Sequence, residues 1–79
     1  MRLDKFLKVS RVIKRRTIAN EACDAGRVTV NGKVAKAGLI VKPGDVIEIR
    51  FGGSTARYEV LSIAENVKKE EANMMYKNL

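Results

Sequence analysis

The sequence contains no histidine, and among its 79 residues there is only one cysteine and one proline. Without histidine, a serine–histidine or cysteine–histidine nucleophile pair cannot be built. Cys23 on its own can form neither an internal disulfide nor the ligand set of a zinc finger. The acidic residues include no pair placed for general acid–base chemistry, and no glycine-rich loop resembles a nucleotide site. These absences predict a protein that is not an enzyme and that holds neither a metal ion nor a cofactor.

Long hydrophobic runs are also missing, although hydrophobic residues make up 46% of the chain, as in a folded protein. The short apolar runs cannot cross a membrane, and no signal-peptide pattern opens the chain. A chain of 79 residues has room for one domain and little more. We therefore expect a single-domain, soluble protein of the cytoplasm.

Positive charge is abundant, and all of its excess lies in the first half of the chain. Residues 37–79 contain six cations and six acids, whereas residues 1–36 contain ten cations and three acids. The ten cations are Arg2, Lys5, Lys8, Arg11, Lys14, Arg15, Arg16, Arg27, Lys33 and Lys36. Such asymmetry predicts a polyanionic partner, with nucleic acid as the first candidate and an anionic membrane as the second.

Two helices are expected in this basic half. Leu3, Phe6 and Leu7 recur at helical spacing, which predicts a helix over roughly residues 3–9 with its lysines on the outer side. A second helix is expected over roughly residues 15–25, with small apolar residues, Cys23 among them, on one arc. Its predicted N-cap is Thr17, and Gly26 is the residue predicted to end it.

Four cations gather where these two helices join, namely Arg11, Lys14, Arg15 and Arg16. Exposed cations at the positive end of a helix dipole cost about 0.3–1 kcal/mol each at low salt, so folding alone would favour acids there. A helix N-terminus flanked by arginines is instead suited to phosphate, because free backbone N–H groups add to the side-chain donors. The alternative interpretation is a plain solvated surface, which is what most charge runs are.

Beyond the second helix the period of the pattern changes from 3.6 to 2. Val28 and Val30 alternate with polar residues, and Asn31-Gly32 then gives a strong hairpin signal. A Pro-Gly-Asp turn precedes a strand over Val46–Phe51, and alternation continues over residues 55–63. These patterns predict a small antiparallel sheet after the helices.

The last residues show helical spacing again, at Ala72, Met75, Tyr76 and Leu79, which predicts a short amphipathic helix. The predicted fold is therefore α+β: two N-terminal helices packed on a small antiparallel sheet, followed by a short C-terminal helix. Residues 1–64 are expected to form one domain, and residues 65–79 a C-terminal amphipathic helix or tail.

The four aromatic residues bear on the kind of nucleic acid that such a protein binds. Phe6 and Phe51 occupy predicted core-facing positions, and Tyr58 and Tyr76 are expected to pack as well. Single strands are bound by exposed rings that stack on bases, so this mode is disfavoured. Recognition of the backbone and shape of a folded RNA fits the sequence better.

Several separated segments resemble the RNA-binding domain that is named after ribosomal protein S4. They are Arg2-Leu3-Asp4-Lys5-Phe6-Leu7, Ser10-Arg11, Thr17, Gly26-Arg27-Val28-Thr29-Val30-Asn31-Gly32 and Val41-Lys42-Pro43-Gly44-Asp45-Val46-Ile47. The resemblance covers roughly residues 2–51. It implies two helices on a small antiparallel sheet, known in that family as the alpha-L motif, and the binding of structured RNA by the helical face and the hairpin.

Carried over by matching position, the resemblance implies RNA contacts for Arg2, Lys5, Ser10, Arg11, Lys14, Arg15, Arg16, Thr17, Arg27 and the turn at Asn31-Gly32. Lys8, Lys33 and Lys36 are added on charge alone. The short chain resembles the stand-alone members of the family that act in bacterial ribosome rescue. It lacks the long basic C-terminal extension of the heat-shock type, and is therefore more similar to the type that supports alanine tailing.

This resemblance implies a monomeric factor that contacts 23S rRNA of the 50S subunit and peptidyl-tRNA, and that works beside an RqcH-type tailing factor. Two alternatives stay open on the sequence. The chain could be an RNA-recruiting subunit of an RNA-modifying enzyme or a ribosome-assembly factor, or it could be a module that binds anionic membranes or scaffolds proteins.

Overall fold

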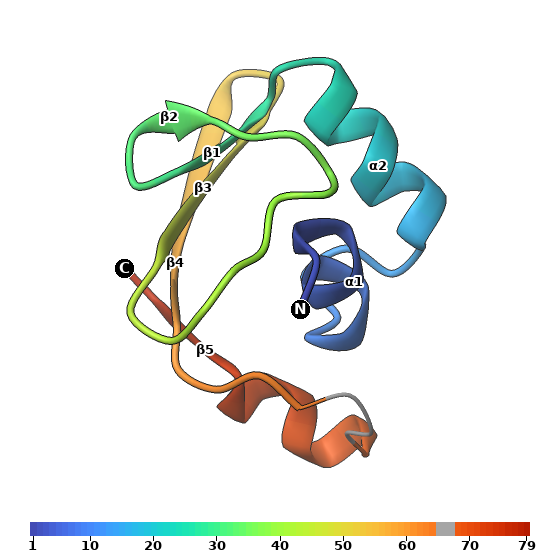
Figure 1. The fold of residues 1–79 in the computed structure, drawn as a ribbon, viewed down its shortest axis with the longest axis vertical. Helices are drawn as coiled ribbons and strands as arrows, with labels where there is room; N and C mark the ends of the chain where they lie inside the picture. The colour runs from blue at the N-terminus through green and yellow to red at the C-terminus, as the bar shows by residue number, and fades with distance from the viewer. Residues whose placement is uncertain (65–67) are drawn as a thin grey trace.

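The computed structural model describes residues 1–64 and 68–79, in which two helices lie on one side of a five-stranded antiparallel sheet (Figure 1). The predicted boundary between residues 64 and 65 reaches outside the described residues. The elements are α1 (Leu3–Val9), α2 (Arg16–Asp24), β1 (Val28–Val30), β2 (Lys33–Val34), β3 (Val46–Phe51), β4 (Ser54–Val60), the 3₁₀ helix η1 (Lys69–Met74) and β5 (Tyr76–Asn78). The strand order is β2-β1-β3-β4-β5. No helix in the described part of the chain is long and apolar enough to span a membrane.

Both predicted N-terminal helices are present, and they enclose the core against the sheet. Helix α1 buries Leu3, Phe6 and Leu7 completely, while α2 contributes Ala19 and Cys23. Because the buried residues of α2 are small, its backbone can approach α1 closely. The core between helices and sheet is therefore built from the apolar positions that the helical spacing predicted.

The ends of α2 agree with the prediction at one terminus only. Gly26 adopts a left-handed φ of 74° and ends the helix as predicted, with its N–H donating to the Cys23 carbonyl at 3.0 Å. The predicted N-cap, Thr17, is wrong. Arg15 occupies that position with extended backbone angles, Thr17 lies inside the first turn, and no side chain caps the helix.

The segment between β2 and β3 closes the fold by crossing the start of α1. The N–H of Leu3 donates to the Leu39 carbonyl at 2.7 Å, and the N–H of Asp4 donates to the Ala37 carbonyl at 3.2 Å. The first amides of a helix have no partner within the helix, so these loop carbonyls satisfy them. The loop and the basic N-terminal helix are thereby held in one rigid unit.

The predicted hairpin forms at Asn31-Gly32. Both residues have positive φ, 53° and 84°, as this tight turn requires. The Asn31 side chain is bound on both sides: its amide donates to Asp45 at 3.1 Å, and its oxygen accepts from the N–H of Val46 at 3.0 Å. This residue therefore ties the hairpin to the start of β3.

The predicted C-terminal helix forms only in part, because the short 3₁₀ helix η1 ends at Met74 and the edge strand β5 follows it. Ala72 and Met75 are buried as the pattern suggested, but Leu79 is exposed. β5 pairs with β4, and Tyr76 packs edge-on against Tyr58 with ring centroids 5.2 Å apart. The free hydrogen-bonding edge of β4 accounts for this outcome, since pairing it satisfies backbone groups that a helix would leave open.

One aromatic expectation also fails. Phe51, predicted to face the core, is 48% exposed at the end of β3. Phe51 is the last residue of β3, and Gly52 and Gly53 begin the turn to β4 directly after it. Alternation places Phe51 on the same face of β3 as Ile47 and Ile49. Those two side chains are buried, but the core does not reach Phe51.

Cys23 is expected to be an unreactive thiol. Burial, together with the nearby Asp4 and Asp24 carboxylates, raises the pKa of the Cys23 thiol to about 11. Because the thiolate is the reactive form, alkylation by iodoacetamide at pH 8 should be roughly 100-fold slower in the native protein than in denaturant. Mass spectrometry of timed samples checks this, and equal rates in the two states would contradict the buried position.

Candidate nucleic-acid interface

The basic N-terminal region is organised around one buried carboxylate, that of Asp4. Asp4 is only 2% exposed, yet hydrogen-bond donors surround its carboxylate. Arg2 Nε lies 3.2 Å from Oδ1, and Arg16 Nε lies 3.2 Å from Oδ2. Asn20 Nδ2 donates to Oδ2 at 3.4 Å, and the N–H of Lys5 donates to Oδ1 at 2.8 Å. A single acid thus joins the N-terminus of the chain to α2.

The environment of Asp4 favours its charged form. Burial alone would raise the pKa of this carboxyl, but hydrogen bonds from Arg16 and from the Lys5 N–H, with the charges of Arg16 and Arg2, outweigh burial. The pKa of Asp4 is therefore lowered from its ordinary value of 3.8. A buried carboxylate paired in this way is costly to unpair, because its partners cannot be replaced by water.

The same contacts orient two guanidinium groups at the surface. The side chains of Arg2 and Arg16 are 50% and 47% exposed, so each bonds to Asp4 along one edge and meets solvent along the rest. Arg16 reaches Asp4 from the first turn of α2, whereas Arg2 reaches it from just before α1. The pair gives two planar donors of fixed direction, a geometry suited to phosphate oxygens.

Arg11, in the connection from α1 to α2, has an unusual backbone conformation. Arg11 has a φ of 63°, and its N–H donates to the Lys8 carbonyl at 3.1 Å to end α1. Glycine is the common residue at this left-handed position, because a side chain there is strained. Arg11 is exposed, so its side chain extends into solvent rather than into the core.

Ser10, predicted to contact RNA, lies in the protein interior instead. It is 1% exposed, and its hydroxyl donates to the Leu7 carbonyl at 3.4 Å. The structure thus corrects the prediction, since a buried hydroxyl cannot touch a large ligand. Ser10 closes the C-terminus of α1 and sets up the turn that carries Arg11.

Lys14 and Arg15 complete the charge at the start of α2. Both are exposed, and they are followed directly by Arg16. The first turn of α2 contains no acidic residue, and Arg15 makes no side-chain cap. The positive end of this nine-residue helix therefore has neither a capping side chain nor an acid in its first turn, and it is surrounded by cations.

The remaining predicted residues divide between this region and others. Lys8 and Thr17 are exposed on α1 and α2 beside the residues just described. Arg27 is exposed at the start of the sheet, by a depression at the C-terminal end of α2. Gly32 is exposed, but the Asn31 side chain is already bound within the protein.

Lys33 and Lys36 lie elsewhere, around a separate pocket that they share with Lys42. Sequence reasoning missed both the role of Asp4 and the presence of Lys42 at that pocket. Asp4 had one signal in the sequence: it is an acid set among the apolar residues that α1 buries, next to Arg2. Acids are rarely buried without partners, so an acid at this position predicts that cations lie nearby.

Known proteins resemble this chain over most of its length. A family model described as the S4 domain matches residues 1–47, which is more than half of the chain. The protein named RQC P-site tRNA stabilizing factor in Halalkalibacterium halodurans is 60% identical over 76 residues, covering 96% of this chain and 86% of that protein. The chain belongs to the S4 domain family. Within the S4 domain family, the protein of the same name in Bacillus subtilis is 55% identical over 76 residues, covering 96% of this chain and 88% of that protein.

A solved S4-like structure shows the same fold. Heat shock protein 15 of Vibrio cholerae matches with a TM-score of 0.90 at 30% identity, covering 100% of this chain and 81% of that one. The resemblance inferred from the sequence and the α+β fold class are thereby confirmed. The greater similarity to the second stand-alone type than to the heat-shock type is confirmed too, because the relatives named RQC P-site tRNA stabilizing factor are 60% and 55% identical and the heat shock protein 30%.

Proposed function

We propose that the chain binds structured RNA through one surface, here called the basic surface, formed by Arg2, Lys5, Lys8, Arg11, Lys14, Arg15, Arg16 and Thr17. The single observation that carries the proposal is the fixed pair of guanidinium groups on Asp4, 3.2 Å from its two oxygens. A solvated charge run needs no buried acid to hold its arginines in place. Oriented donors beside an open helix N-terminus are instead the arrangement that phosphate groups require.

The ligand that we propose is the large ribosomal subunit with its tRNA. The S4 family membership and the relatives named RQC P-site tRNA stabilizing factor support this choice. In this proposal the basic surface contacts both 23S rRNA of the 50S subunit and peptidyl-tRNA, and stabilises the tRNA while an RqcH-type factor adds an alanine tail. The protein acts in the cytoplasm as a monomeric binding factor and catalyses no step itself.

The contribution of such a protein is physically simple. A rigid body that places cations against two phosphate backbones adds the free energy of both contacts, so each RNA binds better when the other is present. If roughly six basic groups meet phosphates, the logarithm of the affinity should fall with the logarithm of salt concentration at a slope of about −4 to −5.

Charge reversal at Lys14 and Arg15 tests the proposal. The double variant Lys14→Glu/Arg15→Glu is expected to lose co-sedimentation with 50S subunits that carry peptidyl-tRNA, and its salt slope on isolated RNA should become shallower by about 2. Both residues are exposed, so the fold is retained. Reversing Arg2 or Arg16 is less informative, because it would set new carboxylates against buried Asp4.

The matched control is Arg50→Glu/Lys77→Glu, which changes the net charge equally. Both residues are exposed on the sheet, on β3 and β5, in the half of the chain that has no net charge. This variant is expected to sediment with the subunits nearly as well as the original protein. If the two double variants behaved alike, net charge rather than the basic surface would govern binding, and the proposal would fail.

A further inference from the structure

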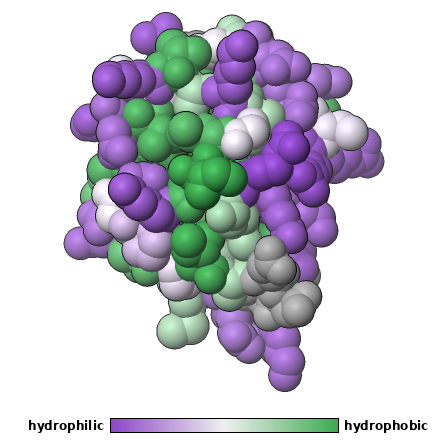
Figure 2. Space-filling view, in the orientation of Figure 1, coloured by the Kyte–Doolittle hydropathy of each residue, from purple (hydrophilic) through white to green (hydrophobic). Residues whose placement is uncertain are grey.

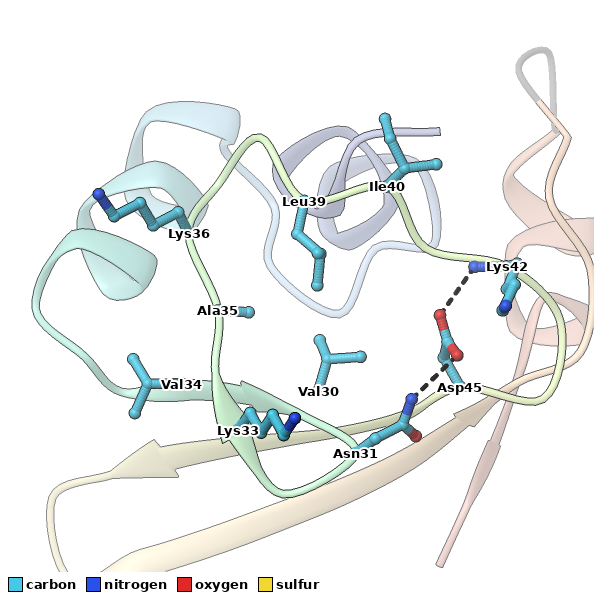
Figure 3. A pocket seen from close by; sticks show the side chains of 10 residues that line it. All are labelled: Val30, Asn31, Lys33, Val34, Ala35, Lys36, Leu39, Ile40, Lys42 and Asp45. Atoms are coloured by element: carbon cyan, nitrogen blue, oxygen red, sulfur yellow. Dashed lines mark hydrogen bonds between the residues drawn. The ribbon is translucent and has the colours of Figure 1, made fainter.

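A second feature of the surface lies between the β1–β2 hairpin and the loop that follows it. This lysine-rimmed pocket is a cavity of about 590 Å³, lined by Val34, Leu39, Ile40, Lys33, Lys36 and Lys42 among others. Figure 3 shows Leu39 pointing into it toward Val30. Figure 2 shows an apolar strip over the region where this loop runs between the sheet and the helices in Figure 1.

The apolar part of the pocket is unusually open to water. Val34 is 68% exposed and Ile40 65%, and Leu39 is also exposed, although all three are aliphatic. Figure 3 shows that Leu39 points into the pocket, whereas Val34 and Ile40 extend outward from different parts of its rim. Exposed aliphatic side chains around a concavity are typical of a binding surface. Their backbone is held firmly, since the Leu39 carbonyl accepts from the first amide of α1. The pocket is therefore preformed.

The charge around the pocket is positive. Its one acid, Asp45, is buried and already bonded, with its oxygens accepting from the Asn31 amide at 3.1 Å and from the Lys42 N–H at 3.0 Å. Across residues 1–64 and 68–79, no ion pair joins the three lysines of the rim to a carboxylate. An occupant must therefore bring apolar groups for the floor and negative charge for the rim.

RNA supplies negative charge but fits the floor poorly. No aromatic side chain lines the pocket to stack on a base, and the one amide that could read a base edge, that of Asn31, is bound within the protein. The aliphatic side chains of a protein partner could instead pack against Val34, Leu39 and Ile40. Carboxylates flanking them match the lysines.

We propose that the lysine-rimmed pocket docks a short acidic segment of a partner protein, with an aliphatic side chain beside Leu39 and carboxylates against the lysines. This gives the molecule a protein-binding surface in addition to the basic surface. Lys33 and Lys36, which charge alone had assigned to RNA, belong to this second surface.

The test is a titration of the ¹⁵N-labelled full chain, followed by NMR, with the capped peptide Asp-Leu-Glu-Leu-Asp-Leu-Glu. Amide shifts are expected in residues 33–42. Peptides with serine in place of leucine, or with asparagine and glutamine in place of the acids, should bind at least tenfold more weakly. An oligouridylate of the same length is the competing probe. If it shifted residues 33–42 while the acidic peptide did not, or if no probe shifted them, the proposal would be overturned.

Variants separate this surface from the basic surface. Leu39→Ser and the milder Lys36→Gln/Lys42→Gln, which removes only exposed charges, should each weaken the peptide at least fivefold. Phe51→Ser, which removes an exposed apolar side chain outside the pocket, is the control and should leave binding unchanged. All three should still bind 50S subunits. Equal peptide binding by every variant would contradict the proposed site, while loss of subunit binding alone would bear on the RNA proposal.

Discussion

The variant Asp4→Asn should bind RNA on the order of tenfold more weakly, although it raises the net charge by one from +7. Asparagine has the shape of aspartate but cannot form an ion pair, so Arg2 and Arg16 lose the contact that orients them. A tenfold loss corresponds to about 1.4 kcal/mol. Fluorescence anisotropy with a labelled 23S rRNA fragment or tRNA measures it.

The matched control is Asp24→Asn, which adds the same charge at the exposed last residue of α2. Long-range attraction alone would make both variants bind RNA slightly better, and this is the result expected for Asp24→Asn. The two variants should therefore move in opposite directions. An affinity for Asp4→Asn equal to that of the control would show that Asp4 positions nothing that RNA contacts.

Acid titration of stability distinguishes weaker folding from weaker binding in the same variant. Because the folded pKa of Asp4 lies below its ordinary value of 3.8, its charge stabilises the fold above that value. This stabilisation is lost as the pH falls through the lowered pKa. Urea unfolding between pH 2 and pH 7 should show a smaller acid-dependent loss in Asp4→Asn than in the original protein. At neutral pH the substitution is expected to cost about 1–3 kcal/mol.

Local patterns predicted the elements whose conformation is decided locally. The apolar spacing of Leu3, Phe6 and Leu7 is satisfied by a helix whatever else surrounds it. Gly26 and the Asn31-Gly32 turn need positive φ, which few residues supply, so these ends could be placed from the sequence. The basic residues could be assigned to the helical half in the same way.

The failures concern the depth at which a residue is buried and contacts between segments far apart in the chain, neither of which a local pattern shows. Ser10 is buried by its place at the end of α1, and a sequence pattern shows its polarity but not its depth. Asp4 meets Arg16 across twelve positions, and Tyr76 meets Val60 across a strand pair that helical spacing does not indicate. Such contacts form only when the sheet and the helices are assembled.

Replacing Arg11 by asparagine should make the protein more stable and less able to bind RNA. Asparagine tolerates the left-handed backbone at φ 63° far better than arginine, so relief of strain should stabilise the fold by about 1 kcal/mol. The substitution also removes one cation of the basic surface, so the salt slope of RNA binding should fall by about 1. Strain retained at a charged residue in this way is typical of a functional site.

The matched variant for this prediction is Lys14→Asn, which removes one exposed cation of the same surface from ordinary backbone. It should lose RNA affinity by a similar factor and gain no stability from relief of strain. Urea unfolding gives the stabilities, and anisotropy at several salt concentrations gives the slopes. Stability and affinity should thus change in opposite directions only at Arg11. If Arg11→Asn kept full affinity while becoming more stable, the strained arginine would have no part in RNA binding, and its retention would need another explanation.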